Sequence, residues 1–244
     1  MSRENILFSI AGLLFGYALA FTLVTYFNLH HAPPQTSQAA GATSGLPSGH
    51  PDVPDEVTRA SIQQAEAEAR RKPQDFDAQM NAAIAFARAD DNESAIEYLT
   101  KARAIDPDSY DTLIGLGTVN YNAGKWNEAE RWYLEALKRK PEDVDARTFL
   151  GLTYSMRQPS DYERAIAEYR KALETEPTHE PALQNLATAY VRKGQLTEAA
   201  ATIETLERAN PNNSSLPTLR KELEQARQKP SARKASEPAK KGKK

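Results

Sequence analysis

Prolines recur at a nearly constant spacing along this chain. Pro73, Pro107, Pro141, Pro177 and Pro211 are separated by 34, 34, 36 and 34 residues. A fixed period of this length is typical of stacked supersecondary units, and it constrains the fold more than any other feature of the sequence. Each proline lacks a backbone N–H and disfavours helix in the residue before it, so each is expected to end one unit.

Small and bulky residues repeat with the same period. A small residue is followed four positions later by a bulky one in the pairs Ala95 and Leu99, Ala129 and Tyr133, Ala165 and Tyr169, and Ala199 and Ile203. Small residues let two helices approach closely, and large residues fill the space against the next unit. The pattern predicts an all-α stack of antiparallel helix pairs.

The turns inside the units are also visible. Gly124 and Gly194 stand at equivalent places, where the first helix of a unit ends and a left-handed turn is expected. The third unit has "RQPSDY" at this place, which accounts for its two extra residues. Ser160 and Glu163 have the spacing of a capping box for the helix that follows.

The repeat resembles the tetratricopeptide repeat family, whose unit follows W-x₂-L-G-x₂-Y, then A-x₃-F, then P. Leu150, Gly151 and Tyr154 match this motif, whereas Gln79, Leu113, Arg147 and Leu183 replace its Trp and Asn120 replaces one Tyr. The resemblance implies a right-handed superhelical solenoid over residues 54–228, made of ten helices. Its repeats are expected at about 76–109, 110–143, 144–179 and 180–213, with covering helices at 55–71 and 215–228.

Residues 6–29 form an uncharged apolar segment that is long enough to cross a hydrocarbon core of about 30 Å. We expect a transmembrane signal anchor; a cleaved signal peptide is the alternative. Arg3 precedes the segment and no Lys or Arg follows it until Arg59, so residues 1–5 are expected in the cytoplasm. The solenoid is then expected on the periplasmic side of a bacterial inner membrane.

Three further features lie near the ends of the chain. Gly12, Gly16 and Ala20 share one helix face, which allows a homodimer through the membrane helix, although glycine is common in such helices anyway. Residues 30–53 are rich in Pro, Gly, Ala and Ser and are expected to be a flexible linker, in which the three His are solvated rather than metal-bound. Residues 229–244 are basic and predicted to be disordered; they either contact anionic surfaces or only solubilise the chain.

The sequence lacks the motifs of an enzyme. It has no Cys, no Gly-rich phosphate loop, no H-E-x-x-H and no nucleophile elbow, so we expect neither catalysis nor a cofactor nor a metal site. Without residues 227–244, which contribute +7 to the net charge of −2, the chain is acidic. No nucleic-acid partner is therefore expected.

The resemblance places a protein or peptide partner on the concave face, which the first helix of each unit forms in this family. The residues at the matching positions are Met80, Ile84, Arg88, Ile114, Thr118, Tyr121, Asn122, Thr148, Leu152, Met156, Gln184, Thr188, Val191 and Arg192. One subclass grips a C-terminal carboxylate with Lys and Asn at fixed positions, where this chain has Met80, Ile84 and Asp145. Carboxylate clamping is therefore not expected. Asp77, Asp111 and Asp145 recur in register, either as an acidic line beside the concave face or as acids that offset helix dipoles.

These observations predict a non-catalytic, membrane-anchored scaffold that binds protein partners during envelope assembly. The architecture resembles bacterial accessory subunits of cytochrome c maturation or of the secretion translocon. A self-associating structural organiser is the alternative.

Overall fold

The computed structural model describes residues 56–235, with side chains from 59 to 228, and within this range every regular element is a helix. The ten helices are α2 (Glu56–Arg71), α3 (Phe76–Arg88), α4 (Asn92–Ile105), α5 (Tyr110–Asn122), α6 (Trp126–Arg139), α7 (Val144–Met156), α8 (Tyr162–Thr175), α9 (Glu180–Lys193), α10 (Leu196–Ala209) and α11 (Leu216–Ala235). The all-helical fold and the expected number of helices are confirmed.

None of the helices α2 to α11 is long and apolar enough to cross a membrane. The predicted anchor at 6–29, the dimer positions Gly12, Gly16 and Ala20, and the linker at 30–53 lie outside the described residues.

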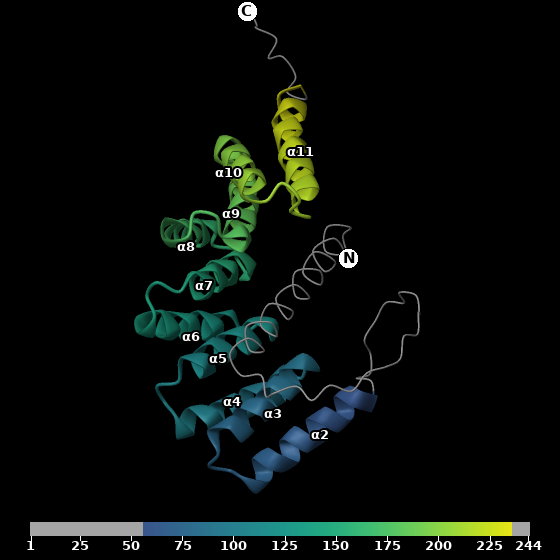
Figure 1. The fold of residues 1–244 in the computed structure, drawn as a ribbon. Helices are drawn as coiled ribbons and strands as arrows, with labels where there is room; N and C mark the ends of the chain where they lie inside the picture. Colours follow the sequence, from purple (N-terminus) through teal and green to yellow (C-terminus); the bar gives the residue numbers. More distant parts are fainter. Residues whose placement is uncertain (1–55, 236–244) are drawn as a thin grey trace, which may run out of the picture.

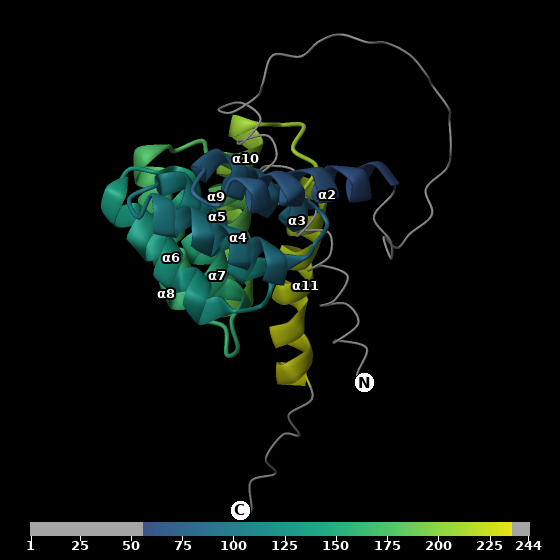
Figure 2. The same cartoon turned by 90° about the horizontal axis from the view of Figure 1, so that it is seen from below.

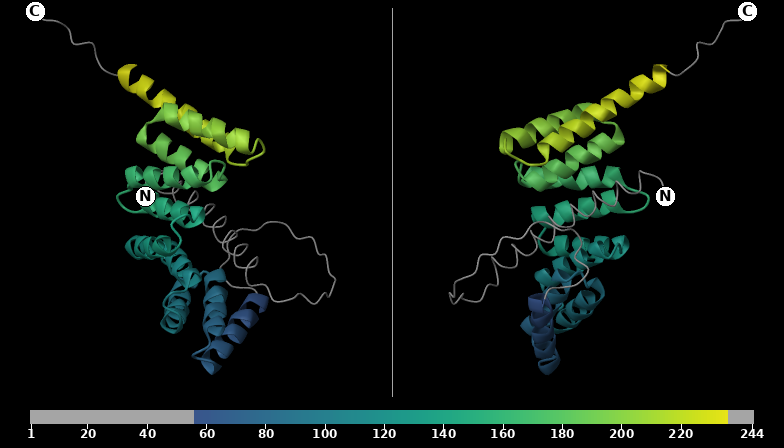
Figure 3. Two further views of the ribbon diagram at one scale, coloured as in Figure 1. Left: turned by 60° about the vertical axis from the view of Figure 1, so that its left-hand side comes forward. Right: turned by 90° about the vertical axis from the view of Figure 1, so that its right-hand side faces the viewer.

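The helices form four antiparallel pairs, which are α3 with α4, α5 with α6, α7 with α8, and α9 with α10. The pairs stack from α2 at one end to α11 at the other (Figure 1). The helix direction turns progressively along the stack, as the two side views in Figure 3 show. The first helices of neighbouring pairs also meet, since α7 contacts both α5 and α9. We call the surface formed by α3, α5, α7 and α9 the first-helix face, and the opposite surface, formed by α4, α6, α8 and α10, the second-helix face.

In two of the helix pairs, the helices approach closely because a glycine without a side chain lies at the contact. A Cβ atom on Gly117 would lie 2.6 Å from Cε1 of Tyr133, and a Cβ atom on Gly151 would lie 2.6 Å from Cε1 of Tyr169. Both tyrosines are almost completely buried, so these rings fill the space that the glycines leave. The periodic small and bulky residues therefore pack as the sequence predicts.

The turn between the two helices of a pair uses left-handed backbone in three of the four repeats. Gly124 and Gly194 have φ values of 70° and 75°, as expected, and Asp90 takes the same role with φ 59°. In the third repeat the predicted capping box is wrong. Asp161, rather than Ser160, caps α8 by accepting a hydrogen bond from the backbone N–H of Arg164.

Helices at both ends cover the repeats. Gln79, which replaces a motif Trp, is buried and donates from Nε2 to the carbonyl oxygens of Ala69 and Lys72, so it holds the end of α2. At the other end α11 buries Leu216, Leu219 and Leu223. It projects past the other helices (Figure 2) and ends at Ala235. The helix thus extends into the segment 229–244, and the disorder expected for that segment stays a prediction.

The core consists of two clusters that meet at α5. One cluster runs from Ala69 to Val119, and the other runs from Leu113 to Leu223. Trp132 packs against both of them from α6.

Candidate functional site

The structure divides the predicted partner-binding residues into buried and accessible groups. Five of them are buried, namely Met80, Ile114, Thr118, Thr148 and Leu152. Their polar groups are satisfied inside the protein: the Thr118 hydroxyl donates to the carbonyl of Ile114 and lies 3.1 Å from the hydroxyl of Tyr133. Because the first helices of neighbouring repeats pack against one another, these side chains belong to the interior rather than to a contact surface.

The accessible group defines a narrower candidate surface. Ile84, Tyr121, Gln184, Thr188 and Val191 are half-buried. Four exposed residues occupy equivalent positions near the ends of the first helices, one in each repeat, and we call them the exposed row: Arg88, Asn122, Met156 and Arg192. Met156 is 36% exposed and is one of two exposed large apolar residues among residues 59–228.

Tyr121 joins this surface to the core. Its ring packs edge-on against Trp126, with centroids 5.2 Å apart and an interplanar angle of 72°. Burial raises the pKa of the Tyr121 hydroxyl, which therefore remains a neutral donor near pH 7. The preceding Asn120 is buried and donates from Nδ2 to the carbonyl of Leu116. Tyr121 was expected on the concave face, and the structure places it between that face and the core.

The recurring acids lie in the first turns of helices. Asp77, Asp111 and Asp145 occupy the first turns of α3, α5 and α7, where a negative charge offsets the positive end of the helix dipole. Asp145 also lies 3.1 Å from Nε2 of His179, one repeat further along. The first-turn positions of these three acids support the helix-dipole interpretation.

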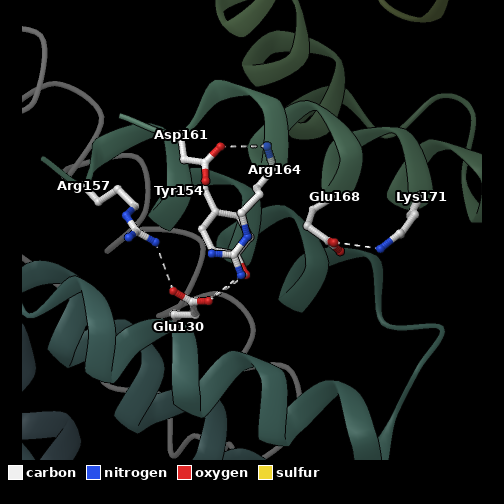
Figure 4. Close-up of polar contacts among 7 residues, drawn as sticks. All are labelled: Glu130, Tyr154, Arg157, Asp161, Arg164, Glu168 and Lys171. Carbon is white, nitrogen blue, oxygen red and sulfur yellow. Dashed lines mark hydrogen bonds and ion pairs between the residues drawn. The ribbon is translucent and has the colours of Figure 1, made fainter. Parts of the chain in front are cut away.

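A carboxylate joins the second and third repeats (Figure 4). Glu130 on α6 accepts hydrogen bonds from the Tyr154 hydroxyl at 3.1 Å and from Arg157 at 3.3 Å, and it pairs with Arg164 at 2.6 Å. The Arg164 guanidinium lies over the Tyr154 ring, with its carbon 4.0 Å from the centroid. Burial, followed by the charge of Glu130, raises the pKa of the Tyr154 hydroxyl.

A second carboxylate lies between the two helices of the third repeat. Glu168 on α8 pairs with Lys171 at 2.8 Å (Figure 4) and with Arg147 of α7 at 3.0 Å. The side chains of Glu168 and Arg147 are only 13% and 18% exposed. Arg147 replaces a motif Trp, so an ion pair takes the place of an aromatic contact here.

Ion pairs between repeats were not predicted from the sequence, although the sequence carries a signal for them. Opposite charges stand about one period apart in Glu93 and Lys125, and in Glu163 and Lys193, and each of these pairs forms at 2.8 Å. Glu130 and Arg164 follow the same rule. Such pairs could have been found by comparing charges at equivalent positions of successive repeats.

Within residues 56–235 no group of three or more His, Asp or Glu side chains is arranged to hold a metal ion. What the described surface offers is a set of accessible polar and apolar side chains on rigid helices, which is suited to binding another macromolecule.

Comparison with known protein families identifies the family to which this chain belongs. Tetratricopeptide repeat patterns match residues 86–152 and 157–228 in one form and residues 58–110 in another. The chain belongs to the tetratricopeptide repeat family. Repeats of this family mediate protein–protein interactions.

Curated tetratricopeptide relatives match over parts of their length. Photosystem I assembly protein Ycf3 of Prochlorococcus marinus (strain NATL2A) is 31% identical over 83 residues, which are 34% of this chain and 48% of that protein. The peroxisomal targeting signal receptor of Komagataella phaffii is 34% identical over 99 residues, covering 41% of this chain and 16% of the receptor. The chain thus spans less than half the length of these relatives.

Solved tetratricopeptide structures share the fold. MamA from Desulfovibrio magneticus RS-1 superposes with a TM-score of 0.59 at 21% identity, covering 66% of this chain and 89% of that one. YrrB, a TPR protein with an unusual peptide-binding site, gives a TM-score of 0.57 at 16% identity, covering 68% and 84%. At these identities the similarity establishes the fold alone.

Proposed function

We propose that this chain is a non-catalytic scaffold that binds a protein or peptide partner on its first-helix face. The observation that carries the proposal is the exposed row, in which every repeat presents one accessible side chain at the same position of its first helix. A partner lying across the repeats would meet Arg88, Asn122, Met156 and Arg192 in turn, beside the half-buried Tyr121. Rigid helices hold the backbone of these residues in place, so little backbone entropy is lost on binding.

The relatives support this role in general terms. Ycf3 is named as an assembly protein, the yeast relative as a targeting signal receptor, and YrrB as a protein with a peptide-binding site. Each of these descriptions involves recognition of another polypeptide. By analogy, we propose that the present chain acts in the assembly of a larger complex.

We further propose that residues 6–29 anchor the chain in a bacterial inner membrane, with the solenoid in the periplasm. The uncharged apolar segment and the absence of Lys and Arg between residues 4 and 58 support this topology. A C-terminal fusion to a reporter that is active only in the cytoplasm should stay silent. Strong reporter activity would reverse the orientation.

Site-specific photocrosslinking in the native cell tests the binding face. A photoreactive residue at Met156 or Asn122 should crosslink to a discrete partner band, because both side chains are exposed on the first-helix face. The control position is Ala201, which is exposed on α10 of the second-helix face. Equal crosslinking from Ala201, or none from Met156 and Asn122, would contradict the proposal. A band at twice the mass of the chain would favour the self-associating organiser.

A further inference from the structure

Two guanidinium groups lie over the indole ring of Trp132. The guanidinium carbon of Arg131 is 4.1 Å from the ring centroid, and that of Arg103, on the neighbouring helix α4, is 4.9 Å away. Trp132 is half-buried, so part of the ring remains at the surface while the rest packs against the core. An arginine stacked on an aromatic ring keeps its N–H donors free for a carboxylate.

The surroundings of Trp132 carry an excess of positive charge. Five cations, Arg103, Arg131, Lys138, Arg139 and Lys140, lie on α4, on α6 or at its C-cap, and of these Lys138 and Arg139 pair with Glu135 and Asp108. Residues 59–228 together hold 23 Lys or Arg against 28 Asp or Glu. Lys138, together with Arg139 and Arg103, lowers the pKa of the Glu135 carboxyl. No ion pair within the described part of the chain uses Arg103 or Arg131.

An exposed apolar side chain lies on the other side of these cations. Leu134 is 40% exposed, the most of any large apolar residue between positions 59 and 228. At 100° per residue, Arg131 and Lys138 lie between Trp132 and Leu134 around the α6 axis, nearer to Leu134. On the same arc Glu128, Glu135 and Arg139 lie nearer to Trp132. We call Arg103, Arg131, Trp132, Leu134 and Lys138 the α6 patch. Trp and Arg are the residues most enriched at the energetic centres of protein interfaces.

We propose that the α6 patch is a second partner-binding surface, on the second-helix face, and that its partner is an acidic protein segment with apolar side chains beside its carboxylates. The carboxylates would pair with Arg103, Arg131 and Lys138. The apolar side chains would cover the exposed parts of Trp132 and Leu134. Charge complementarity selects this partner, because a basic or uncharged segment would leave the stacked guanidinium groups unpaired.

The two tryptophans of the chain allow a direct test. Trp126→Phe leaves Trp132 as the only tryptophan. The full-length variant in detergent is titrated with a synthetic peptide of alternating Glu and Leu, with the same peptide carrying Lys for Glu, and with oligoglutamate. The emission of Trp132 should change saturably with the Glu and Leu peptide only, and the apparent affinity should fall with added salt.

Two matched double variants distinguish specific binding at the α6 patch from nonspecific attraction between opposite charges. Arg103→Gln with Arg131→Gln should weaken binding by at least about tenfold, and Leu134→Ala by a smaller factor. Arg170→Gln with Lys221→Gln removes the same charge from exposed positions on α8 and α11 and should leave binding within about twofold of the parent. Unchanged melting curves establish that each variant is folded. Equal weakening by both double variants, equal binding of oligoglutamate, or no saturable change would overturn the proposal.

Discussion

Gly117 lies so close to the ring of Tyr133 that a methyl group does not fit between them, since its Cβ would stand 2.6 Å from the ring edge. Tyr133 cannot move aside easily, because it is 1% exposed and its hydroxyl contacts Thr118. This contact fixes the distance between α5 and α6. Gly151 and Tyr169 repeat it between α7 and α8.

Gly117→Ala should therefore destabilise the solenoid. Overpacking is expected to cost about 1 to 3 kcal/mol, which outweighs the gain of roughly 1 kcal/mol in helix propensity. Gly115→Ala is the matched control, since its Cβ would meet the flexible end of Leu99 at 2.9 Å rather than an aromatic ring. Chemical denaturation of both variants measures the difference. An equal or larger loss for Gly115→Ala would contradict this account.

Glu130→Gln should weaken the boundary between the second and third repeats. The substitution removes the negative charge that Arg157, Arg164 and the Tyr154 hydroxyl share, at a side chain that is 20% exposed. We expect a loss of about 1 to 3 kcal/mol in the free energy of unfolding.

Glu93→Gln is the comparison for this boundary, because it also joins two repeats but its carboxylate is 83% exposed. Its loss should stay below about 1 kcal/mol and disappear in high salt. If the two variants are equally stable, the contacts of Glu130 do not hold the repeats together.

Buried tyrosines should make the protein sensitive to alkali. Burial raises the pKa of Tyr133 and Tyr169 above that of an unfolded tyrosine, about 10. Their neutral forms therefore stabilise the fold fully below about pH 10, and this contribution is lost as the pH rises from there through the raised pKa values.

Above about pH 10, the free energy of unfolding should fall with pH, and each such tyrosine should add roughly 1.4 kcal/mol per pH unit to the slope. The free energy of unfolding, measured from pH 8 to 11.5, should fall less steeply for Tyr133→Phe than for the parent. Identical slopes would show that this hydroxyl titrates normally in the folded protein.

Tyr121 should contribute to both stability and partner binding. Tyr121→Ala removes a half-buried ring and its edge contact with Trp126, and it should cost about 1 to 3 kcal/mol. Tyr121→Phe keeps the ring and should retain most of that stability. Crosslinking from Met156 to the partner should be lost in Tyr121→Ala when measured below its melting temperature. Undiminished crosslinking in Tyr121→Ala would show that Tyr121 is not part of the binding face.

The sequence predicted local features well. Gly124 and Gly194 take the left-handed turns expected of them, because only the local backbone decides their role. The cap of α8 was assigned one residue too early, since Ser160 and Asp161 are both good capping residues and the path of the loop chooses between them. Glu163, expected in the same capping box, pairs with Lys193 of the next repeat instead.

The candidate site was harder to predict for a physical reason. Which first-helix residues are accessible depends on how closely α5, α7 and α9 approach one another, and that distance is a property of the stack rather than of one unit. Ile114 and Thr118 are buried for this reason, although their positions within the repeat fit a contact surface. The arginine contacts of Trp132 were missed because Arg103 comes from the preceding repeat.

The division of the core at α5 creates an interface at which the solenoid can open locally. Opening α2 to α4 away from α5 would expose Leu116 and Val119 and leave the leucines and tyrosines further along covered. In a chain of nearest-neighbour units, the weakest interface decides where the array opens first. Amide hydrogens of α3 and α4 should then exchange with solvent ahead of those in α7 to α9, and Trp132, which touches both clusters, should report the opening through its fluorescence.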